Sequence, residues 1–113
     1  MKSYQFGVDY YPEHWPKERW ATDAQMMRDM GIQIVRMAEF SWQKFEPREG
    51  EFHFEELDEA IEILAQEGID VILGTPTAAP PKWIIDRNPE IQPTDWRGHQ
   101  RFFGRSREID VLT

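Results

Sequence analysis

The sequence predicts an α/β fold in which parallel strands alternate with helices. Three apolar segments with strand character are separated by two segments in which apolar residues recur at helical spacing. Strands joined in this order through helices form a parallel sheet with right-handed crossovers. A closed barrel of eight such units needs roughly 250 residues, whereas this chain has 113. The sequence therefore predicts the opening part of a larger α/β fold, with open sheet edges.

The first strand is expected within residues 5–11, where aromatic and β-branched side chains favour extended structure. Pro12 ends this strand, and Pro16 suits the first turn of a helix because its missing N–H would have no partner there. Gly31 is suited to cap the end of that helix. The expected apolar face of the helix consists of Trp20, Ala24, Met27 and Met30.

The second strand is expected at residues 32–37, and it leads through a loop at residues 38–42 into a turn-rich segment at residues 46–50. A second helix is expected at about residues 55–67, because acidic residues crowd its first turn, where the helix dipole favours anions. Gly68 ends this helix. Its expected apolar face consists of Leu57, Ile61 and Leu64.

The third strand, at residues 70–73, runs into a segment at residues 74–83 that we call the proline loop. Its three prolines restrict the backbone and remove donors, so the loop is suited to hold the shape of a binding site. The alternative is that its Pro-Pro pair only halts the strand while Trp83 packs into a core. Residues 82–87 are expected to form a short helix, and the chain after Asn88 is expected to be mostly loop.

Composition excludes several classes of partner. The chain has 13 Lys and Arg against 21 Asp and Glu, a formal net charge of -8, and it has no basic stripe that could neutralise phosphates. We therefore expect neither nucleic acid nor a membrane as a partner. No apolar run approaches the roughly 20 residues that span a bilayer, and the N-terminus lacks a hydrophobic signal segment. The expected location is cytoplasmic.

Metal ions and cofactors are not expected either. The chain has no cysteine, which excludes disulfides, thiol catalysis and thiolate metal sites. The glycines are scattered singly, without a phosphate-binding fingerprint. The histidines, which show no ligand spacing, are His14, His53 and His99.

Three loops are expected at the carboxyl ends of the parallel strands, where α/β folds place their binding sites. Residues 9–15, residues 38–42 and the proline loop all contain aromatic rings, and the first two add carboxylates. Aromatic faces pack against sugar C–H groups while acids bond sugar hydroxyls, so a carbohydrate is the expected ligand. The alternative is that the tryptophans are core residues and the carboxylates pair locally. The expected pocket wall consists of Asp9, Tyr11, Glu39, Trp42 and Trp83.

Several motifs occur in a specific order along the chain. They are residues 8–16, 35–42, 46–47, 57–61 and 74–83. In this order they resemble the start of the bacterial beta-galactosidases of glycoside hydrolase family 42, and the resemblance runs from Phe6 to Arg107. It implies the N-terminal part of a TIM-barrel catalytic domain, with the first three β/α units only. The family's complete chains are several times longer and often trimeric, so the resemblance also implies a homo-oligomer.

The resemblance implies a complete enzyme that hydrolyses terminal non-reducing β-D-galactosyl residues with retention. Retaining enzymes use two carboxyl groups, and in this family these are glutamates after the fourth and seventh barrel strands. One belongs to an Asn-Glu motif, and the sequence contains no Asn-Glu pair. We therefore name no catalytic residue, and we expect an N-terminal fragment of a beta-galactosidase that is inactive by itself.

One binding residue follows from the resemblance. Family members have a Phe-Gly motif followed by an arginine that contacts the galactosyl unit. Residues 103–107 are similar to it, with Arg107 in the place of that arginine. A guanidinium offers forked donors that suit sugar hydroxyls. The alternative is that Arg107 is an ordinary surface arginine.

The expected division of the chain is a barrel portion at residues 1–107 and a tail at residues 108–113 that departs from the family pattern. Some family members have a zinc site that needs a cysteine, and no such site is inferred for a chain without cysteine. Two other functions stay open. One is a non-catalytic sugar-binding or interaction module, and the other is an inactive truncated gene product whose open sheet edges favour aggregation.

Overall fold

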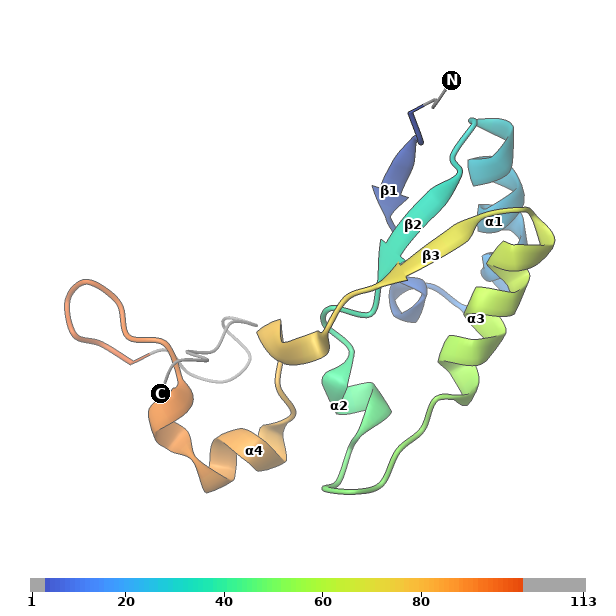
Figure 1. The fold of residues 1–113 in the computed structure, drawn as a ribbon. Helices are drawn as coiled ribbons and strands as arrows, with labels where there is room; N and C mark the ends of the chain where they lie inside the picture. The colour runs from blue at the N-terminus through green and yellow to red at the C-terminus, as the bar shows by residue number, and fades with distance from the viewer. Residues whose placement is uncertain (1–3, 101–113) are drawn as a thin grey trace. The chain divides into compact units, whose positions relative to one another are not determined.

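The computed structural model describes residues 4–100, and the chain divides into two units. Unit 1 consists of residues 1–37 and 54–74, and unit 2 consists of residues 38–53 and 75–113. Unit 1 contains a parallel sheet and two helices (Figure 1). Unit 2 consists of two segments, one that follows the second strand and one that follows the third strand.

Unit 1 is organised around a parallel sheet with the strand order β1-β2-β3. Strand β1 is Gly7–Asp9, β2 is Ile34–Met37 and β3 is Asp70–Leu73. The predicted α/β fold with three parallel strands is confirmed. The first two strands are shorter than expected, and the third has the expected bounds.

Gly7 allows β1 to lie close to β2. A Cβ atom at this position would lie 2.6 Å from Ile34 Cγ2 and 2.8 Å from Ile34 O. The second of these atoms belongs to the backbone of the neighbouring strand, so it cannot move aside without disturbing the sheet. A glycine is therefore required where the two strands meet.

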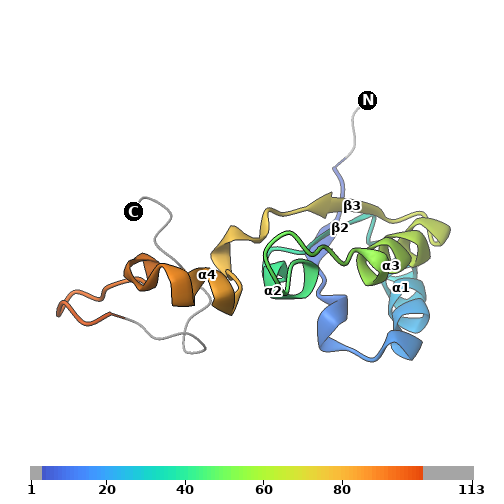
Figure 2. The same ribbon diagram turned by 90° about the horizontal axis from the view of Figure 1, so that it is seen from below.

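Two helices cover one face of this sheet (Figures 1 and 2), as right-handed crossovers require. Helix α1 is Trp20–Asp29 and follows two 3₁₀ turns at Pro12–His14 and Lys17–Arg19. Helix α3 is Glu55–Gln66. The buried apolar residues of unit 1 are Pro12, Trp20, Ala24, Met27, Ile32, Val35, Met37, Ala60, Leu64 and Ile69.

Both helices of unit 1 end in the same way. Gly31 follows α1 with φ +87°, and Gly68 follows α3 with φ +72°. The next residue, Ile32 or Ile69, is buried and donates its N–H back to the last turn of the helix at 3.0 Å. This Schellman motif turns each helix into the following strand. Met30 was expected on the apolar face of α1, but it caps the helix end and is 68% exposed, so this expectation is wrong.

Unit 2 contains short helices and turns. Helix α2 is Trp42–Phe45 and α4 is Lys82–Arg87, with 3₁₀ turns at Pro76–Ala78 and Pro89–Ile91. The predicted helix at residues 82–87 is confirmed. Helix α2 was not predicted, because four residues are too few to show an apolar period. Within residues 4–100, no helix combines the length and apolarity needed to cross a membrane.

Candidate functional site

The carboxyl ends of the strands lie at one edge of the sheet of unit 1, because the strands are parallel. Beyond β1, the N–H of Tyr10 donates to Arg36 O at 3.0 Å. Beyond β3, the N–H of Gly74 donates to Met37 O at 2.9 Å. Strand pairing therefore continues to the points where the chain leaves β2 and β3 and enters unit 2.

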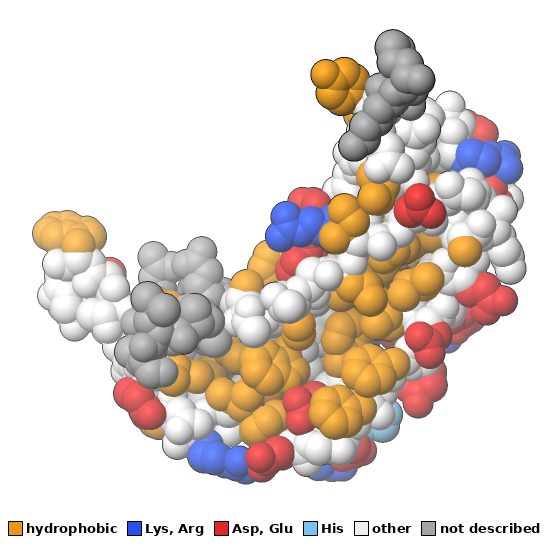
Figure 3. All heavy atoms as spheres, viewed as in Figure 1, with side chains coloured by type: hydrophobic (Ala, Val, Ile, Leu, Met, Phe, Trp, Pro, Cys, Tyr) orange, Lys and Arg blue, Asp and Glu red, His pale blue; other side chains and the backbone are white. Residues whose placement is uncertain are grey.

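The predicted wall residue Asp9 lies on the sheet face that the helices of unit 1 do not cover. Val35 and Met37 are buried at 1% and 0% exposure, so strand alternation places Arg36 on the opposite face. Asp9 and Ile72 share the row of Arg36 in the register, and all three residues are exposed. Figure 3 shows apolar and charged side chains side by side at the surface of the sheet. Asp9 is thus exposed near the carboxyl edge.

The two adjacent tyrosines after β1 have different environments. The hydroxyl of Tyr10 donates to Asp23 Oδ2 of α1 at 2.9 Å. Burial first, and then this hydrogen bond to Asp23, raise the pKa of Tyr10. Tyr11, a predicted wall residue, is half-buried, and its ring centroid lies 5.6 Å from that of His14. Tyr10 therefore anchors the loop to α1, while Tyr11 contacts a residue of the loop itself.

Asp23 is a buried carboxylate that joins the first loop, residues 9–15 at the end of β1, to α1. Its Oδ1 accepts the Arg19 Nε–H at 2.9 Å, and the Arg19 guanidinium lies 4.4 Å from the ring centre of Trp15. A second anchor is the Trp20 indole N–H, which donates to Pro12 O at 2.9 Å. Asp23 was not predicted as a site residue, although an acidic residue on the apolar face of a helix was the available signal.

Unit 2 begins with a residue in an unfavourable backbone conformation. Ala38 has φ +81°, a region that residues with a Cβ atom rarely adopt. Its carbonyl accepts the N–H of Ser41 at 3.2 Å, which closes a tight turn. Glu39, a predicted wall residue, lies in this turn and is 5% exposed. Backbone strain of this kind is concentrated at functional sites.

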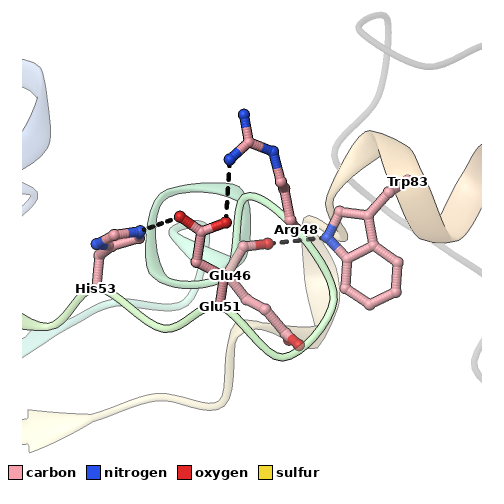
Figure 4. A network of polar contacts seen from close by, with 5 residues as sticks. All are labelled: Glu46, Arg48, Glu51, His53 and Trp83. Carbon is pink, nitrogen blue, oxygen red and sulfur yellow. Dashed lines mark hydrogen bonds and ion pairs between the residues drawn. The ribbon is translucent and has the colours of Figure 1, made fainter.

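Glu46 brings together Trp42 and Trp83, two of the predicted wall residues. Its Oε1 accepts the indole N–H of Trp42 at 2.8 Å, and its Oε2 accepts the backbone N–H of Gly50 at 2.8 Å. Its backbone oxygen accepts the indole N–H of Trp83 at 2.9 Å (Figure 4). The hydrogen bonds from Trp42 and then Gly50 hold the pKa of Glu46 below its ordinary value of 4.5.

Trp83 has further contacts on α4. The guanidinium of Arg87 lies 5.5 Å from the Trp83 ring centre, and Arg87 Nη1 pairs with Glu49 at 2.6 Å. The backbone N–H of Lys82 donates to Gln43 Oε1 at 2.9 Å. Within unit 2, α4 is thus tied to the segment that follows β2. Trp83 itself is half-buried, so it is not a fully packed core residue.

A second carboxylate, that of Glu51, lies in the turn after Glu46 (Figure 4). It accepts a hydrogen bond from Arg48 Nη1 and pairs with His53 Nε2, both at 3.1 Å. His53 first, and then Arg48, lower the pKa of Glu51. Among residues 4–100, no group of three or more His, Asp or Glu side chains is arranged to hold a metal ion.

The predicted wall residues are thus distributed between the units. Asp9 and Tyr11 belong to unit 1, whereas Glu39, Trp42 and Trp83 belong to unit 2. Within unit 2, Glu46 joins the two tryptophans. The predicted sugar-binding residue, at position 107, lies outside the described residues. The residues that sequence analysis missed are Asp23 and Glu46.

Comparison with known proteins yields consistent matches. A family model of the glycoside hydrolase 42 group, described as "Beta-galactosidase", matches residues 9–112. The chain is 57% identical over 101 residues to a beta-galactosidase of Thermus thermophilus. This alignment covers 89% of this chain and 16% of that protein. The chain is 50% identical over 103 residues to beta-galactosidase Bga of Halorubrum lacusprofundi. This alignment covers 91% of this chain and 15% of that protein.

Solved structures agree with this match. The crystal structure of beta-galactosidase from the psychrophilic Marinomonas ef1 superposes with a TM-score of 0.84 at 56% identity, covering 94% of this chain and 16% of that chain. The crystal structure of beta-galactosidase from Bacillus circulans sp. alkalophilus superposes with a TM-score of 0.82 at 34% identity, covering 93% of this chain and 16% of that chain. The chain thus spans about one sixth of these relatives and corresponds to their N-terminal part. The predicted partial barrel fold is confirmed.

Proposed function

Because the chain belongs to glycoside hydrolase family 42, we propose that it supplies the first three β/α units of a catalytic barrel that hydrolyses terminal non-reducing β-D-galactosyl residues with retention. The observation that carries this proposal is the 57% identity over 101 residues to a beta-galactosidase of Thermus thermophilus. The enzyme in the proposal is the complete protein, of which this chain is the N-terminal portion. The proposed division at residue 107 stays a prediction.

The chain's proposed part in this reaction is to bind the sugar. Retention requires two carboxyl groups about 5–5.5 Å apart, and we place neither of them in this chain. Barrel enzymes build their sites from the loops at the carboxyl ends of the strands. Those loops here contain the proposed wall residues Asp9, Tyr11, Glu39, Trp42 and Trp83. Arg107 is the proposed contact with the galactosyl unit.

The proposed wall has the chemistry that a sugar requires. Indole rings pack against the C–H groups of a pyranose, and carboxylates accept hydrogen bonds from its hydroxyls. The support comes from Trp42 and Trp83, whose N–H edges are both occupied by Glu46. Rings held in this way can present a face to a ligand without losing further conformational freedom on binding.

A chimera tests the proposal. In the Thermus thermophilus enzyme, the stretch that matches this chain is replaced by the corresponding residues of this chain. Turnover of a chromogenic β-galactoside is expected, with the product released first as the β-anomer when it is followed by NMR. The 113-residue chain assayed alone is expected to show no turnover. A folded chimera without activity, beside an active parent, would count against the proposal.

A second candidate function is a non-catalytic sugar-binding module. The observation that favours it is the aromatic wall on a chain in which no catalytic carboxylate pair is assigned. Galactose titrated against the chain should then change the fluorescence of its five tryptophans in a saturable way. A linear response up to tens of millimolar sugar would remove this candidate.

The complete enzyme is further proposed to be a cytoplasmic homotrimer that binds a β-galactoside, with neither nucleic acid nor membrane as a partner. The net charge of -8 supports the exclusion of nucleic acid. The trimer rests on the family resemblance. Light scattering of the active chimera measures its mass directly, and a monomer that retains activity would contradict the oligomer.

A further inference from the structure

Glu46 makes hydrogen bonds with three other residues of unit 2, two in its own segment of residues 38–53 and one on α4. Its side chain accepts from Trp42 and from Gly50, and its backbone oxygen accepts from Trp83. We propose that Glu46 is a positioning residue that sets the orientation of both indole rings in the wall of the sugar site. This inference rests on the proposed function for the identity of that wall.

The first contact holds Trp42 on a helix that is too short to hold it alone. Helix α2 has four residues, and an isolated helix of this length is unstable. Glu46 ends the helix, and its own N–H donates to Trp42 O at 2.8 Å. The indole N–H then donates to the carboxylate, a bond strengthened by the negative charge. Trp42 is therefore fixed at its backbone and at its ring edge.

The second contact sets the direction of the Glu46 carbonyl group. Oε2 accepts the N–H of Gly50, which has φ +79°, so the carboxylate closes the turn that begins at Glu46. A backbone bridge between Arg48 and Glu51 narrows the same turn. A carbonyl group in a closed turn has little freedom to rotate. The acceptor offered to Trp83 therefore has a defined position.

The third contact connects segments that are distant in sequence. Trp83 lies 37 residues after Glu46 and donates its indole N–H to the Glu46 backbone oxygen (Figure 4). Arg87 contacts the ring of Trp83 as well. With its edge held by Glu46 and its ring contacted by Arg87, the indole has a defined plane. A single residue of the segment after β2 thus orients one tryptophan of its own segment and one from the proline loop.

Indole N–H signals in a ¹⁵N-labelled sample of the full chain test this coupling. In Glu46→Gln, one of the two acceptor oxygens becomes an NH₂ donor, so Trp42 and Gly50 can no longer be bound by separate oxygens. We expect the Trp42 signal to move upfield and exchange faster with water, and the Trp83 signal to shift as the turn relaxes. The Trp20 signal, whose indole bonds Pro12 in unit 1, should stay in place and reports that the chain is folded.

Glu51→Gln is the matched control. It makes the same chemical change in the same turn, at a carboxylate whose hydrogen bonds go to Arg48 and His53 and not to an indole. It should leave the signals of Trp42 and Trp83 unchanged. If Glu46→Gln unfolds the chain, Glu46→Asp replaces it, since a shorter carboxylate cannot span both donors. Unchanged Trp42 and Trp83 signals in a folded Glu46 variant would overturn the proposal.

The chimera separates positioning from a purely structural role. Glu46→Gln in the active chimera is expected to raise KM for the galactoside roughly tenfold, about the effect of losing one hydrogen bond to a charged group, with a smaller change in kcat. Glu51→Gln should leave both constants unchanged. An unchanged KM in Glu46→Gln would overturn the role in sugar binding. A wild-type chimera without activity would instead contradict the proposed function, and the indole signals would still decide whether Glu46 orients the tryptophans.

Discussion

Unit 1 and unit 2 are stabilised by different kinds of interaction. In the described part of the chain, unit 2 contributes few buried apolar side chains, namely Ala38, Ile85, Pro80 and Pro81. Unit 1 contributes the remainder, on a backbone held by parallel strand pairing. The structure of unit 2 is held together instead by side-chain hydrogen bonds and ion pairs. The difference indicates a division between a scaffold held by apolar burial and loops whose polar contacts set the shape of the proposed wall.

The largest expected effect is in the core of unit 1. Leu64 on α3 is 1% exposed, and Leu64→Ala removes apolar contacts and leaves a cavity. The free energy of unfolding should fall by about 2–5 kcal/mol, measured by urea denaturation followed by circular dichroism. Ile85→Ala in unit 2, at a residue 8% exposed, is expected to cost less. An equal or larger loss at Ile85 would break the comparison.

A smaller loss is expected from the polar anchor of unit 1. Asp23→Ala leaves the hydroxyl of Tyr10 and the guanidinium of Arg19 without their shared acceptor. Tyr10 is half-buried and Arg19 is exposed, so the loss should be about 1 kcal/mol, the lower end of the cost of an unsatisfied polar group, which the same urea titration resolves. The control is Asp29→Ala, at a carboxylate whose side chain is 72% exposed. If both variants unfold at the same urea concentration, Asp23 does not anchor the first loop.

The two units should also respond to pH in opposite directions. Glu46 and Glu51 in unit 2 have lowered pKa values. Their contribution to the free energy of unfolding is therefore fully present above the ordinary pKa of 4.5 and is lost as the pH falls through the lower native pKa values. Lys17 in unit 1 has a raised pKa because it bonds Glu59. Its contribution to the free energy of unfolding is fully present below the ordinary pKa of 10.5 and is lost as the pH rises through the raised native pKa.

Indole N–H signals followed during acidification measure this difference. From about pH 6 to about pH 3, the Trp42 signal should change before the Trp20 signal, because Trp42 donates to a carboxylate and Trp20 donates to a backbone oxygen. Simultaneous changes in the two signals would show that the units respond to acid together.

The smallest expected effect is at an exposed ion pair of α4. Lys82 and Asp86 are 2.7 Å apart with side chains 62% and 60% exposed. Lys82→Gln should lower the free energy of unfolding by about 0.5 kcal/mol or less, since solvent screens such pairs. A double-mutant cycle with Asp86→Asn measures the coupling. A coupling above about 1 kcal/mol would show that surface charge stabilises unit 2 more than the comparison allows.

Prediction from the sequence is accurate where local signals mark both ends of an element. Strand β3 and helix α4 have the predicted bounds, because glycines lie on both sides of the strand and prolines lie on both sides of the helix. It failed at Met30, because the apolar spacing in the sequence continues past the point at which the cap ends α1. It also failed at α2, whose start follows a turn at the positive φ of Ala38.

The candidate site was predicted in part. The loops and their aromatic residues followed from the rule that parallel α/β folds bind ligands at the carboxyl ends of their strands. The roles of Tyr10 and Tyr11 could not be distinguished, because which of two adjacent residues faces a helix depends on the register of the sheet. Glu46 lies in a turn-rich segment, and no local pattern indicates that it meets Trp83.

The sequence by itself determined the order of the elements, the parallel sheet and the family, because apolar spacing and glycine and proline positions act over a few residues and survive without a folded context. The tertiary structure alone decided which polar groups meet. Asp23 reaches Tyr10 across 13 positions, and Glu46 reaches Trp83 across 37. Such contacts form only after the sheet and helices bring distant segments together, since a hydrogen bond with a net contribution of about 1 kcal/mol cannot order a long chain segment by itself.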